Sequence, residues 1–268
     1  MQLSIITVNL NNLEGLKRTL QSIVEQTYRD FEWIVVDGDS TDGSREYMEQ
    51  NKQYTSHYIS EKDTGIYNAM NKGIRFAKGE YLLFLNSGDW FSNPNILSDI
   101  FQQAPNSDIF FGRVTMHINW GVYTMGQSTA NFSVFSLLTI PIAHQATFYR
   151  KVLIDKYGSY DESFYLAGDV DFNFRCIVCK KCSVKYLDII VADCDGDGLS
   201  SHPKKDISND RNRIIRKNLP RLIGRDLPNP YWQIEVEKAI RLWKRVQGIP
   251  FLKWGYRLLI KPLIKQEC

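Results

Sequence analysis

The feature that most constrains this chain is the alternation of short apolar segments with amphipathic ones over its N-terminal third. Four stretches have the length and apolar character of strands: residues 3–8, 32–37, 57–60 and 81–85. The segments between them show helical spacing of apolar residues, over residues 13–24, 43–52 and 65–77. Apolar strands that alternate with amphipathic helices indicate a mostly parallel sheet covered by helices on both faces. The sequence therefore predicts an α/β fold.

Polar side chains follow the predicted strands at their carboxyl ends. Asn9 follows the first strand, Asp37 ends the second, Asp63 follows the third and Asp89 follows the fourth. Ligands of such sheets bind beyond the carboxyl ends of the strands, where carboxylates can bind a ribose or a base, or hold a hard cation beside a phosphate. Each Asp taken alone could instead cap a helix or a turn, and Asp42 is assigned such a role. Together they predict a binding pocket at this edge.

The rest of the chain divides into two further parts. Residues 105–195 mix strand-like stretches at 108–114, 117–124, 145–150 and 184–192 with a helix at about 168–180. Beyond residue 205 the chain is expected to be helical, with segments near 206–223, 231–247 and 251–265. We therefore predict a catalytic domain over 1–205, with halves 1–103 and 104–205, and a helical extension over 206–268.

This C-terminal extension is strongly basic. Beyond residue 210 there are 14 Lys and Arg against four Asp and Glu, a net charge of +10, which leaves −7 on the first 210 residues. Residues 249–265 combine large apolar and aromatic side chains with regularly spaced cations and no acid, a composition that suits an anionic membrane surface. A helix packed on the catalytic domain is the alternative. Nucleic acid is not expected as a partner, because no recognition motif accompanies the charge.

The chain shows neither a secretory signal nor an apolar run long enough to span a membrane, so a cytoplasmic protein, peripheral on the inner face of the membrane, is expected. Its five cysteines are then reduced. Cys176, Cys179 and Cys182 have an iron–sulfur-like spacing but fall in a predicted helix, which favours packing. The Asp-rich stretch at 193–198 begins like a calcium loop, yet Lys204 stands where Glu is needed.

Four stretches of the N-terminal part resemble the successive motifs of family 2 glycosyltransferases, in order and at the usual spacing. They are SIITVNLN (4–11), WIVVDGDSTDG (33–43), SEKDTGIYNAMNKG (60–73) and FLNSGD (84–89). The similarity extends from residue 3 to about 202 and is greatest to enzymes of bacterial exopolysaccharide, colanic-acid and O-antigen synthesis. It implies the GT-A fold, a nucleotide-diphospho-sugar donor, a divalent cation (Mn²⁺ or Mg²⁺) and inversion at the anomeric carbon.

The same resemblance implies roles for individual residues on the donor side. Thr7, Val8 and Asn9 would line the nucleoside pocket, partly through their backbone. Asp37 would bind the uracil or ribose, and Asp63 would lie near the base. The segment that contains Ser87 and Gly88 takes the place of the acidic metal motif, with Asn86 and Gly88 where many members have Asp. Asp89 is then its one carboxylate, which with diphosphate oxygens and water can hold Mg²⁺.

The stretch LAGDVDFNFR (166–175) resembles the Glu-Asp-x-Asp-Leu motif of the family, with Gly168 in place of Glu. Asp169 would be the general base that takes the proton of the acceptor hydroxyl, although a helix N-cap would also suit it. Asp171 would support it, near the acceptor or diphosphate. His144 and Gln145 are also assigned to the acceptor or diphosphate, with a structural histidine as the alternative.

His202 lies on a loop after the last predicted strand, and closure of that loop could bring it to the diphosphate or the metal. An exposed loop histidine is the alternative. Lys204 and Lys205 could add positive charge to the same closure.

The sequence thus predicts an inverting glycosyltransferase that moves a sugar from a nucleotide-sugar, with UDP as the expected nucleotide, to a hydroxyl of a glycan or lipid-linked acceptor in bacterial cell-surface polysaccharide synthesis. Two other functions are compatible with parts of this sequence. A nucleotidyltransferase should carry a Gly-rich, basic segment after its first strand, and Asn9-Leu-Asn-Asn12 is neither. A catalytically weak, membrane-associated nucleotide-sugar-binding protein is favoured by the reduced metal motif and opposed by the presence of both Asp89 and Asp169.

Overall fold

The computed structural model describes residues 1–103, 106–119, 121–126, 137, 142–196, 198, 210, 213–214 and 216–218. The chain divides into two compact units, Met1–Ile214 and Ile215–Cys268. The elements described below all belong to the first unit. None of its described helices has the length and hydropathy that crossing a bilayer would require.

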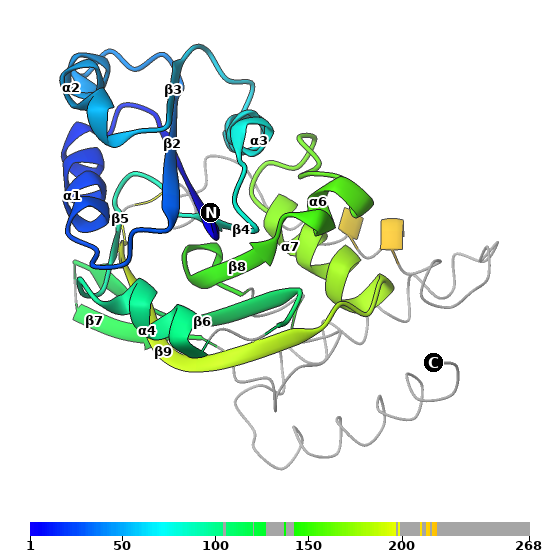
Figure 1. Cartoon of the computed structure of the whole chain (residues 1–268). Coiled ribbons are helices and arrows are strands. Elements are labelled where there is room, and N and C mark those ends of the chain that lie inside the picture. Colours follow the sequence, from blue (N-terminus) through cyan, green and yellow to red (C-terminus); the bar gives the residue numbers. More distant parts are fainter. Residues whose placement is uncertain are drawn as a thin grey trace, which may run out of the picture. The chain divides into compact units, whose positions relative to one another are not determined.

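Four parallel strands form the N-terminal half of the sheet (Figure 1). They are β1 (Leu3–Asn9), β2 (Phe31–Asp37), β3 (His57–Ser60) and β4 (Tyr81–Phe84), in the spatial order β3-β2-β1-β4. Asn9 is paired with Asp37, and Asp37 with Ser60. The polar ends of three adjacent strands therefore fall in one row, as the sequence predicts.

Helices cover both faces of this half, which confirms the predicted layers. The helices α1 (Leu13–Val24) and α2 (Ser44–Asn51) lie on one side of β2, and α3 (Ile66–Phe76) lies on the other (Figure 1). A 3-10 turn, Lys52–Tyr54, follows α2. Every residue of β1 is buried, which explains why its apolar residues Leu3, Ile5, Ile6 and Val8 do not alternate strictly with polar ones. The side chain of Asn12 caps α1 by accepting from the Gly15 amide at 3.1 Å.

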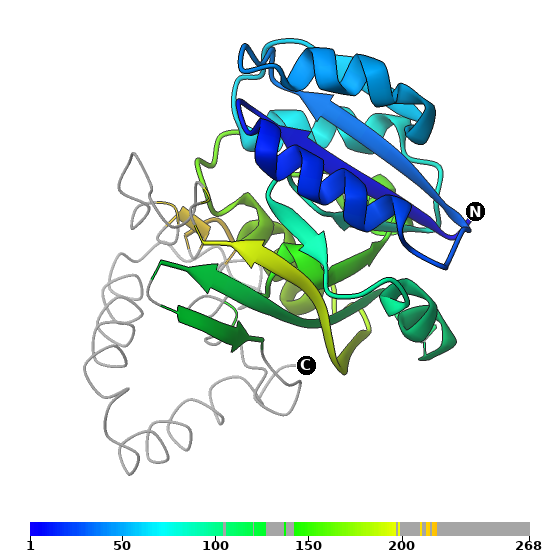
Figure 2. The same ribbon diagram turned by 90° about the vertical axis from the view of Figure 1, so that its left-hand side faces the viewer.

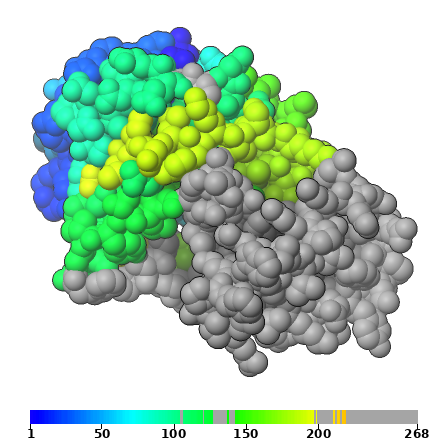
Figure 3. All heavy atoms as spheres, turned by 90° about the horizontal axis from the view of Figure 1, so that it is seen from below, coloured from blue at the N-terminus to red at the C-terminus, as the bar shows by residue number. Residues whose placement is uncertain are grey.

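The C-terminal half extends the sheet with strands of both directions. Its strands are β5 (Asp89–Phe91), β6 (Ile109–Ile118), β7 (Gly121–Met125), β8 (Thr147–Arg150) and β9 (Val184–Asp195). From β4 the order continues β8-β6-β9-β5, with β7 paired to β6. Because β8 runs antiparallel to β4 and to β6, the complete sheet is mixed. Figure 2 shows β6, β7 and β9 side by side, and on the face seen in Figure 3 the atoms of β9 form a band beside those of β6 and β7.

The remaining elements of this half are helices and turns. They are α4 (Ile96–Gln103), a 3-10 turn (His144–Ala146), α6 (Val152–Tyr157), α7 (Gly168–Asn173) and a π-helix (Phe174–Cys179). Together α7 and the π-helix occupy the helix predicted at about 168–180. The predicted break between strands at residues 115–116 is wrong, because Thr115 and Met116 pair with β7 on one side and with β9 on the other.

Aromatic side chains fill the core where the two halves of the sheet meet. Phe110 and Phe148 stack with ring centroids 4.7 Å apart, and both side chains are fully buried. Tyr149 and Phe172 meet edge to face at 5.3 Å, which attaches α7 to β8. This packing fixes the start of α7 relative to the carboxyl ends of the parallel strands.

Candidate functional site

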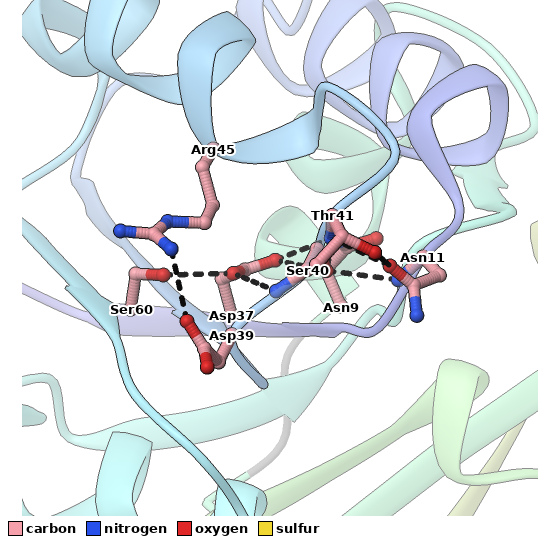
Figure 4. Close-up of polar contacts among 8 residues, drawn as sticks. All are labelled: Asn9, Asn11, Asp37, Asp39, Ser40, Thr41, Arg45 and Ser60. Carbon is pink, nitrogen blue, oxygen red and sulfur yellow. Dashed lines mark hydrogen bonds and ion pairs between the residues drawn. The ribbon is translucent and has the colours of Figure 1, made fainter.

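Asp37 is the centre of a hydrogen-bonded cluster at the carboxyl ends of β1, β2 and β3 (Figure 4). Its Oδ1 accepts from Asn9 Nδ2 at 2.8 Å and from Ser40 Oγ at 2.6 Å. Its Oδ2 accepts from the Ser40 amide and from Ser60 Oγ, both at 2.9 Å. A carboxylate offers about four acceptor positions, and here all four are used by the protein itself. Asp37 is fully buried, so the predicted contact with uracil or ribose would require the exchange of one of these bonds.

The loop after β2 is fastened to the loop after β1. The backbone N–H of Asn11 donates to Ser40 Oγ at 2.8 Å, and the side-chain Oδ1 of Asn11 accepts from the backbone N–H of Thr41 at 2.8 Å. Asn11 and Asp39 both have left-handed backbones, with φ of 50° and 65°, an uncommon conformation that Asn and Asp tolerate better than most residues. Asp39 forms an ion pair with Arg45 at 2.9 Å (Figure 4). The two loops therefore form one preorganised rim of the site.

The side chains of Thr7 and Val8 are both buried. Thr7 is fully buried, its hydroxyl donating to the Leu85 carbonyl at 2.7 Å and accepting from Trp33 Nε1 at 2.9 Å. This corrects the expectation for the Thr7 side chain, because a nucleoside at this position could contact only the backbone. Val8 is 8% exposed and belongs to the core.

Asp63 lies next to this cluster and is paired with a buried lysine. Lys72 Nζ lies 2.8 Å from Asp63 Oδ1 and 2.8 Å from Glu61 Oε1. The other oxygen of Asp63 would lie 3.1 Å from a Cβ placed on Gly38, so the carboxylate rests against the end of β2. Burial raises the pKa of Asp63, and Lys72 opposes that shift. Asp37 and Asp63, both predicted to bind the nucleotide-sugar donor, are thus brought to one end of the sheet.

Asp89 lies at the end of the 86–89 segment, whose turn is held by Gly88 with φ of +95°. Asn12 Nδ2 donates to the Ser87 carbonyl at 3.0 Å, which ties the turn to the start of α1. Asp89 is 7% exposed, and its Oδ1 lies 3.4 Å from Gln145 Nε2. Burial raises the pKa of Asp89 to about 7, against the hydrogen bonds from Cys194 and Gln145, which lower it. Gln145, which is not predicted from the sequence to adjoin Asp89, therefore contacts it.

The residues around Asp89 fit a divalent cation whose coordination is completed by a substrate. Among the described residues no three His, Cys, Asp or Glu side chains group as a ready-made metal site. Asp89 supplies a carboxylate whose charge is poorly solvated, and Asn86 Oδ1 is a buried oxygen with no hydrogen-bond partner. Carboxylate and amide oxygens are ligands that Mg²⁺ and Mn²⁺ accept, and Mg²⁺ is commonly bound by few protein groups together with substrate phosphates and water.

Asp169 lies at the start of α7 and faces two polar side chains. Tyr67 donates its hydroxyl to Oδ1 at 3.0 Å, and His144 Nδ1 lies 3.9 Å from Oδ2. His144 Nε2 in turn lies 3.1 Å from Asn86 Nδ2, in the segment that carries Asp89. The N-cap position of α7 is occupied by Ala167, with no side-chain cap, so the capping role considered for Asp169 is not what the structure shows. Its side chain is 14% exposed and can reach a substrate.

Asp171 is the clearest correction among the predicted site residues. It is fully buried and forms an ion pair with Arg175 Nε at 2.9 Å. Arg175 also donates to the carbonyls of Tyr157 and Ser159 at 2.7 Å each. Asp171 therefore holds the preceding loop against α7 and cannot contact an acceptor or a diphosphate.

Other predicted residues have structural roles or lie outside the described residues. Asp42 accepts from the first backbone amides of two helices, that of Leu13 at 2.8 Å and that of Ser44 at 3.1 Å, although the N-cap positions belong to Asn12 and Gly43. Two acidic residues of the rejected calcium loop are engaged elsewhere: Asp193 contacts His117, and Asp195 pairs with Arg18. His202, Lys204, Lys205 and the basic residues 219–268 lie outside the part of the chain that the structure describes.

Two residues that matter to the site were missed in the sequence. Lys72 left a signal, since a lysine beside Gly73 on the apolar face of the predicted helix needs a carboxylate partner, and it finds Asp63. Tyr67 left none, because an aromatic residue at a helical core position is ordinary and only its contact with Asp169 distinguishes it.

Comparison with known proteins agrees with this geometry. The sequence profile described as Glycosyl transferase family 2 matches residues 4–156. An uncharacterized glycosyltransferase of Mycobacterium tuberculosis is 34% identical over 208 residues, which cover 74% of this chain and 77% of the relative. A PGL/p-HBAD biosynthesis glycosyltransferase of Mycobacterium bovis is 33% identical over 199 residues, covering 70% of this chain and 75% of the relative.

Two solved structures share the fold at low sequence identity. S. aureus TarS 1–349, in complex with UDP-GlcNAc, matches with a TM-score of 0.70 and 19% identity, over 90% of this chain and 70% of TarS 1–349. The mannosyltransferase PcManGT of Pyrobaculum calidifontis, in complex with GDP-Man and Mn²⁺, matches with a TM-score of 0.55 and 17% identity, over 97% of this chain and 80% of PcManGT.

Proposed function

This chain is a glycosyltransferase of family 2 with a GT-A fold, and from that premise we propose that it transfers a sugar from a UDP-sugar, with inversion, to a hydroxyl of a glycan or lipid-linked acceptor. Membership of this family removes the nucleotidyltransferase alternative.

The observation that carries the proposal is the turn His144–Ala146, which contacts both carboxylates. Gln145 lies 3.4 Å from Asp89, and His144 lies 3.9 Å from Asp169. One carboxylate lies in the segment that would hold the diphosphate, and the other lies across the turn from it. An inverting transfer needs this separation, because the acceptor attacks the anomeric carbon from the side opposite the leaving diphosphate.

Asp169 is the group that would take the proton of the acceptor. As the acceptor oxygen forms its bond to the anomeric carbon, its proton passes to Asp169, and the bond between that carbon and the diphosphate oxygen breaks to release UDP. Tyr67 occupies Oδ1, so Oδ2 is the carboxylate oxygen without a hydroxyl donor. A cation bound by Asp89, with the Asn86 amide oxygen beside it, would offset the charge that develops on the departing diphosphate.

UDP is favoured as the nucleotide by the similarity to TarS, which binds UDP-GlcNAc on the same fold. The match to a mannosyltransferase that binds GDP-Man and Mn²⁺ keeps GDP-sugars as the competing result. A relative named as a PGL/p-HBAD biosynthesis glycosyltransferase supports a biosynthetic sugar transfer to an acceptor molecule. Together with the basic extension, this relative leads us to propose that the enzyme acts at the cytoplasmic face of the membrane, in the synthesis of surface glycans.

The experiment that tests the proposal is a screen of UDP- and GDP-sugars by thermal shift, with Mn²⁺ or with EDTA, followed by measurement of nucleotide release from the sugar that stabilises most. We expect stabilisation by a UDP-sugar that requires the cation, and release of UDP. Stabilisation without any nucleotide release, with water or with added glycan acceptors, would favour the binding-protein alternative instead.

A further inference from the structure

The ring of Tyr67 fills the position that a side chain at residue 168 would occupy. A Cβ placed on Gly168 would lie 2.9 Å from three atoms of this ring, closer than such atoms approach in proteins. Tyr67 is 4% exposed and packs against Tyr160 with centroids 5.4 Å apart, so the ring has no room to withdraw. Gly168 is the residue that replaces Glu of the family motif. Its lack of a side chain is what admits the tyrosine.

The hydroxyl of that ring binds one oxygen of the adjacent carboxylate. Tyr67 Oη donates to Asp169 Oδ1 at 3.0 Å, while His144 Nδ1 faces the other oxygen, Oδ2, at 3.9 Å. The two carboxylate oxygens are therefore inequivalent. Oδ1 is held by a hydroxyl that reaches it from α3, and Oδ2 is left to face the turn that precedes β8.

We propose that Tyr67 is a positioning residue that holds Oδ1 of Asp169 and so makes Oδ2 the oxygen that accepts the acceptor proton, with Gly168 as the gap that lets the ring enter. This inference rests on the proposed role of Asp169 as general base. It adds which of its oxygens reacts, what orients it, and why glycine stands at position 168.

The groups that face Asp169 are neutral at physiological pH. The phenol of Tyr67 therefore keeps its proton and donates it in the hydrogen bond to the carboxylate. Burial raises the pKa of Tyr67 well above its usual value, with the Asp169 charge adding to the shift, so the phenol remains a donor. Burial likewise raises the pKa of Tyr149 and of Tyr160, the two other phenols that interact with this carboxylate. Burial lowers the pKa of His144, so its imidazole is neutral.

Loss of the phenol should therefore have two effects that simple destabilisation would not. A hydrogen bond to the charged form of a carboxylate favours that form, so its removal should shift the acid limb of the pH–kcat profile to higher pH. The freed carboxylate can rotate, and misplacement of a reacting group by about 1 Å can lower the rate by ~10²-fold. Donor KM should change little, because none of the described hydrogen bonds of Asp37 involves Tyr67.

The test compares Tyr67→Phe, Gly168→Ala and Asp169→Asn with a matched control, Tyr81→Phe. Tyr81 is also buried and donates to an oxygen, the Ser107 carbonyl, at 3.0 Å, but it lies at the opposite end of β4. Release of UDP from the donor sugar found by the screen gives kcat, KM and the pH profile. We expect Tyr67→Phe and Gly168→Ala to lower kcat by roughly 10-fold or more, with the acid limb displaced in Tyr67→Phe and neither effect in Tyr81→Phe.

Crystal structures of the wild type and of Tyr67→Phe give a readout that does not depend on turnover. We expect the Asp169 carboxylate to be rotated about its Cβ–Cγ bond in the variant. An unmoved carboxylate, or an unchanged kcat and pH profile in Tyr67→Phe beside an inactive Asp169→Asn, overturns the positioning role and leaves the base in place. Wild-type turnover by Asp169→Asn would instead remove the base on which the inference rests.

Discussion

The amide nitrogen of Asn86 lies 3.1 Å from Nε2 of His144, and this contact joins the carboxyl end of β4 to the turn that precedes β8. Because the amide nitrogen can only donate, Nε2 accepts, and the proton of the neutral ring is then on Nδ1, which faces Asp169. The adjacent Gln145 contacts Asp89. Two neighbouring side chains thus connect the segment that carries Asp89 to the proposed base.

The first prediction concerns the base. Asp169→Asn keeps the size of the side chain and can still accept from Tyr67, but it removes the carboxylate that takes the acceptor proton. We expect kcat to fall by ~10²–10⁴-fold while the affinity for UDP is nearly unchanged. Nucleotide release and calorimetry with UDP measure the two quantities separately.

The control for this prediction is Asp155→Asn, which removes an exposed carboxylate of α6 paired with Lys151. It should leave both kcat and UDP affinity at the wild-type value. Near wild-type turnover by Asp169→Asn would mean that another group is the base. Asp171 could not replace it, since it is buried against Arg175.

The second prediction concerns the cation. UDP should bind at least about tenfold more tightly with Mn²⁺ than with EDTA, a difference of about 1.4 kcal/mol, because a diphosphate beside Asp89 needs a cation to offset repulsion. Asp89→Asn should abolish the dependence on Mn²⁺. Asn86→Asp should strengthen it, since cation affinity rises with the number of charged ligands. Calorimetry checks all three proteins, and equal UDP affinity with and without Mn²⁺ in the wild type would remove the metal role from Asp89.

The parallel half of the fold could be predicted because its signals are local. The buried strands β1 and β2 are mostly apolar, and the apolar stripe of α3 is complete within one segment. The other half could not be predicted to the same extent. The strand β5 is three residues long, and the antiparallel pairing of β8 with β4 depends on contacts between segments far apart in the sequence. A short strand with no periodicity carries no information about its partner.

The site shows the same division between local and long-range information. Asn9 and Asp37, the last residues of β1 and β2, could be placed at one edge of the sheet from their order alone. The state of each carboxylate could not, because Asp37 is saturated by Ser40 and Ser60, and Asp171 is neutralised by Arg175, through contacts that only the folded chain makes. Whether an acidic residue is free for a ligand depends on its neighbours in space.

The third prediction concerns Asp42, in the loop between β2 and α2, and its contribution to the stability of the fold. Burial by itself raises the pKa of Asp42, but hydrogen bonds from Ser44 and Leu13 outweigh it, and the pKa is lowered. The stabilisation is therefore present above the unfolded pKa, near 3.9, and is lost as the pH falls through the lower folded value. Asp42→Ala should lower the free energy of unfolding by about 1–2 kcal/mol at pH 7, and by less near pH 3.

Denaturation by urea at the two pH values measures this difference. The matched control is Glu49→Ala, which removes an exposed acid of α2 that pairs only with Lys52 in the described contacts. It should change stability by no more than about 0.5 kcal/mol at either pH. An Asp42→Ala effect as large at pH 3 as at pH 7 would mean that the charge of Asp42 does not stabilise the two helix ends.

The last prediction concerns the basic extension as a membrane contact. Residues 249–265 place Lys253, Arg257, Lys261 and Lys265 among Trp254, Tyr256 and a cluster at 258–260. Each cation near an anionic surface contributes ~1 kcal/mol, reduced by salt, so four cations with a few inserted apolar side chains give reversible attachment.

Full-length protein should sediment with phosphatidylserine vesicles at low salt, should be released by high salt, and should not sediment with purely phosphatidylcholine vesicles. A chain that ends at Gly248 should lose this binding but keep its UDP affinity, which shows that the catalytic unit is intact. Equal sedimentation of the two proteins with anionic vesicles, or no binding by either, would mean that the extension packs on protein and that a lipid-linked acceptor must be reached in another way.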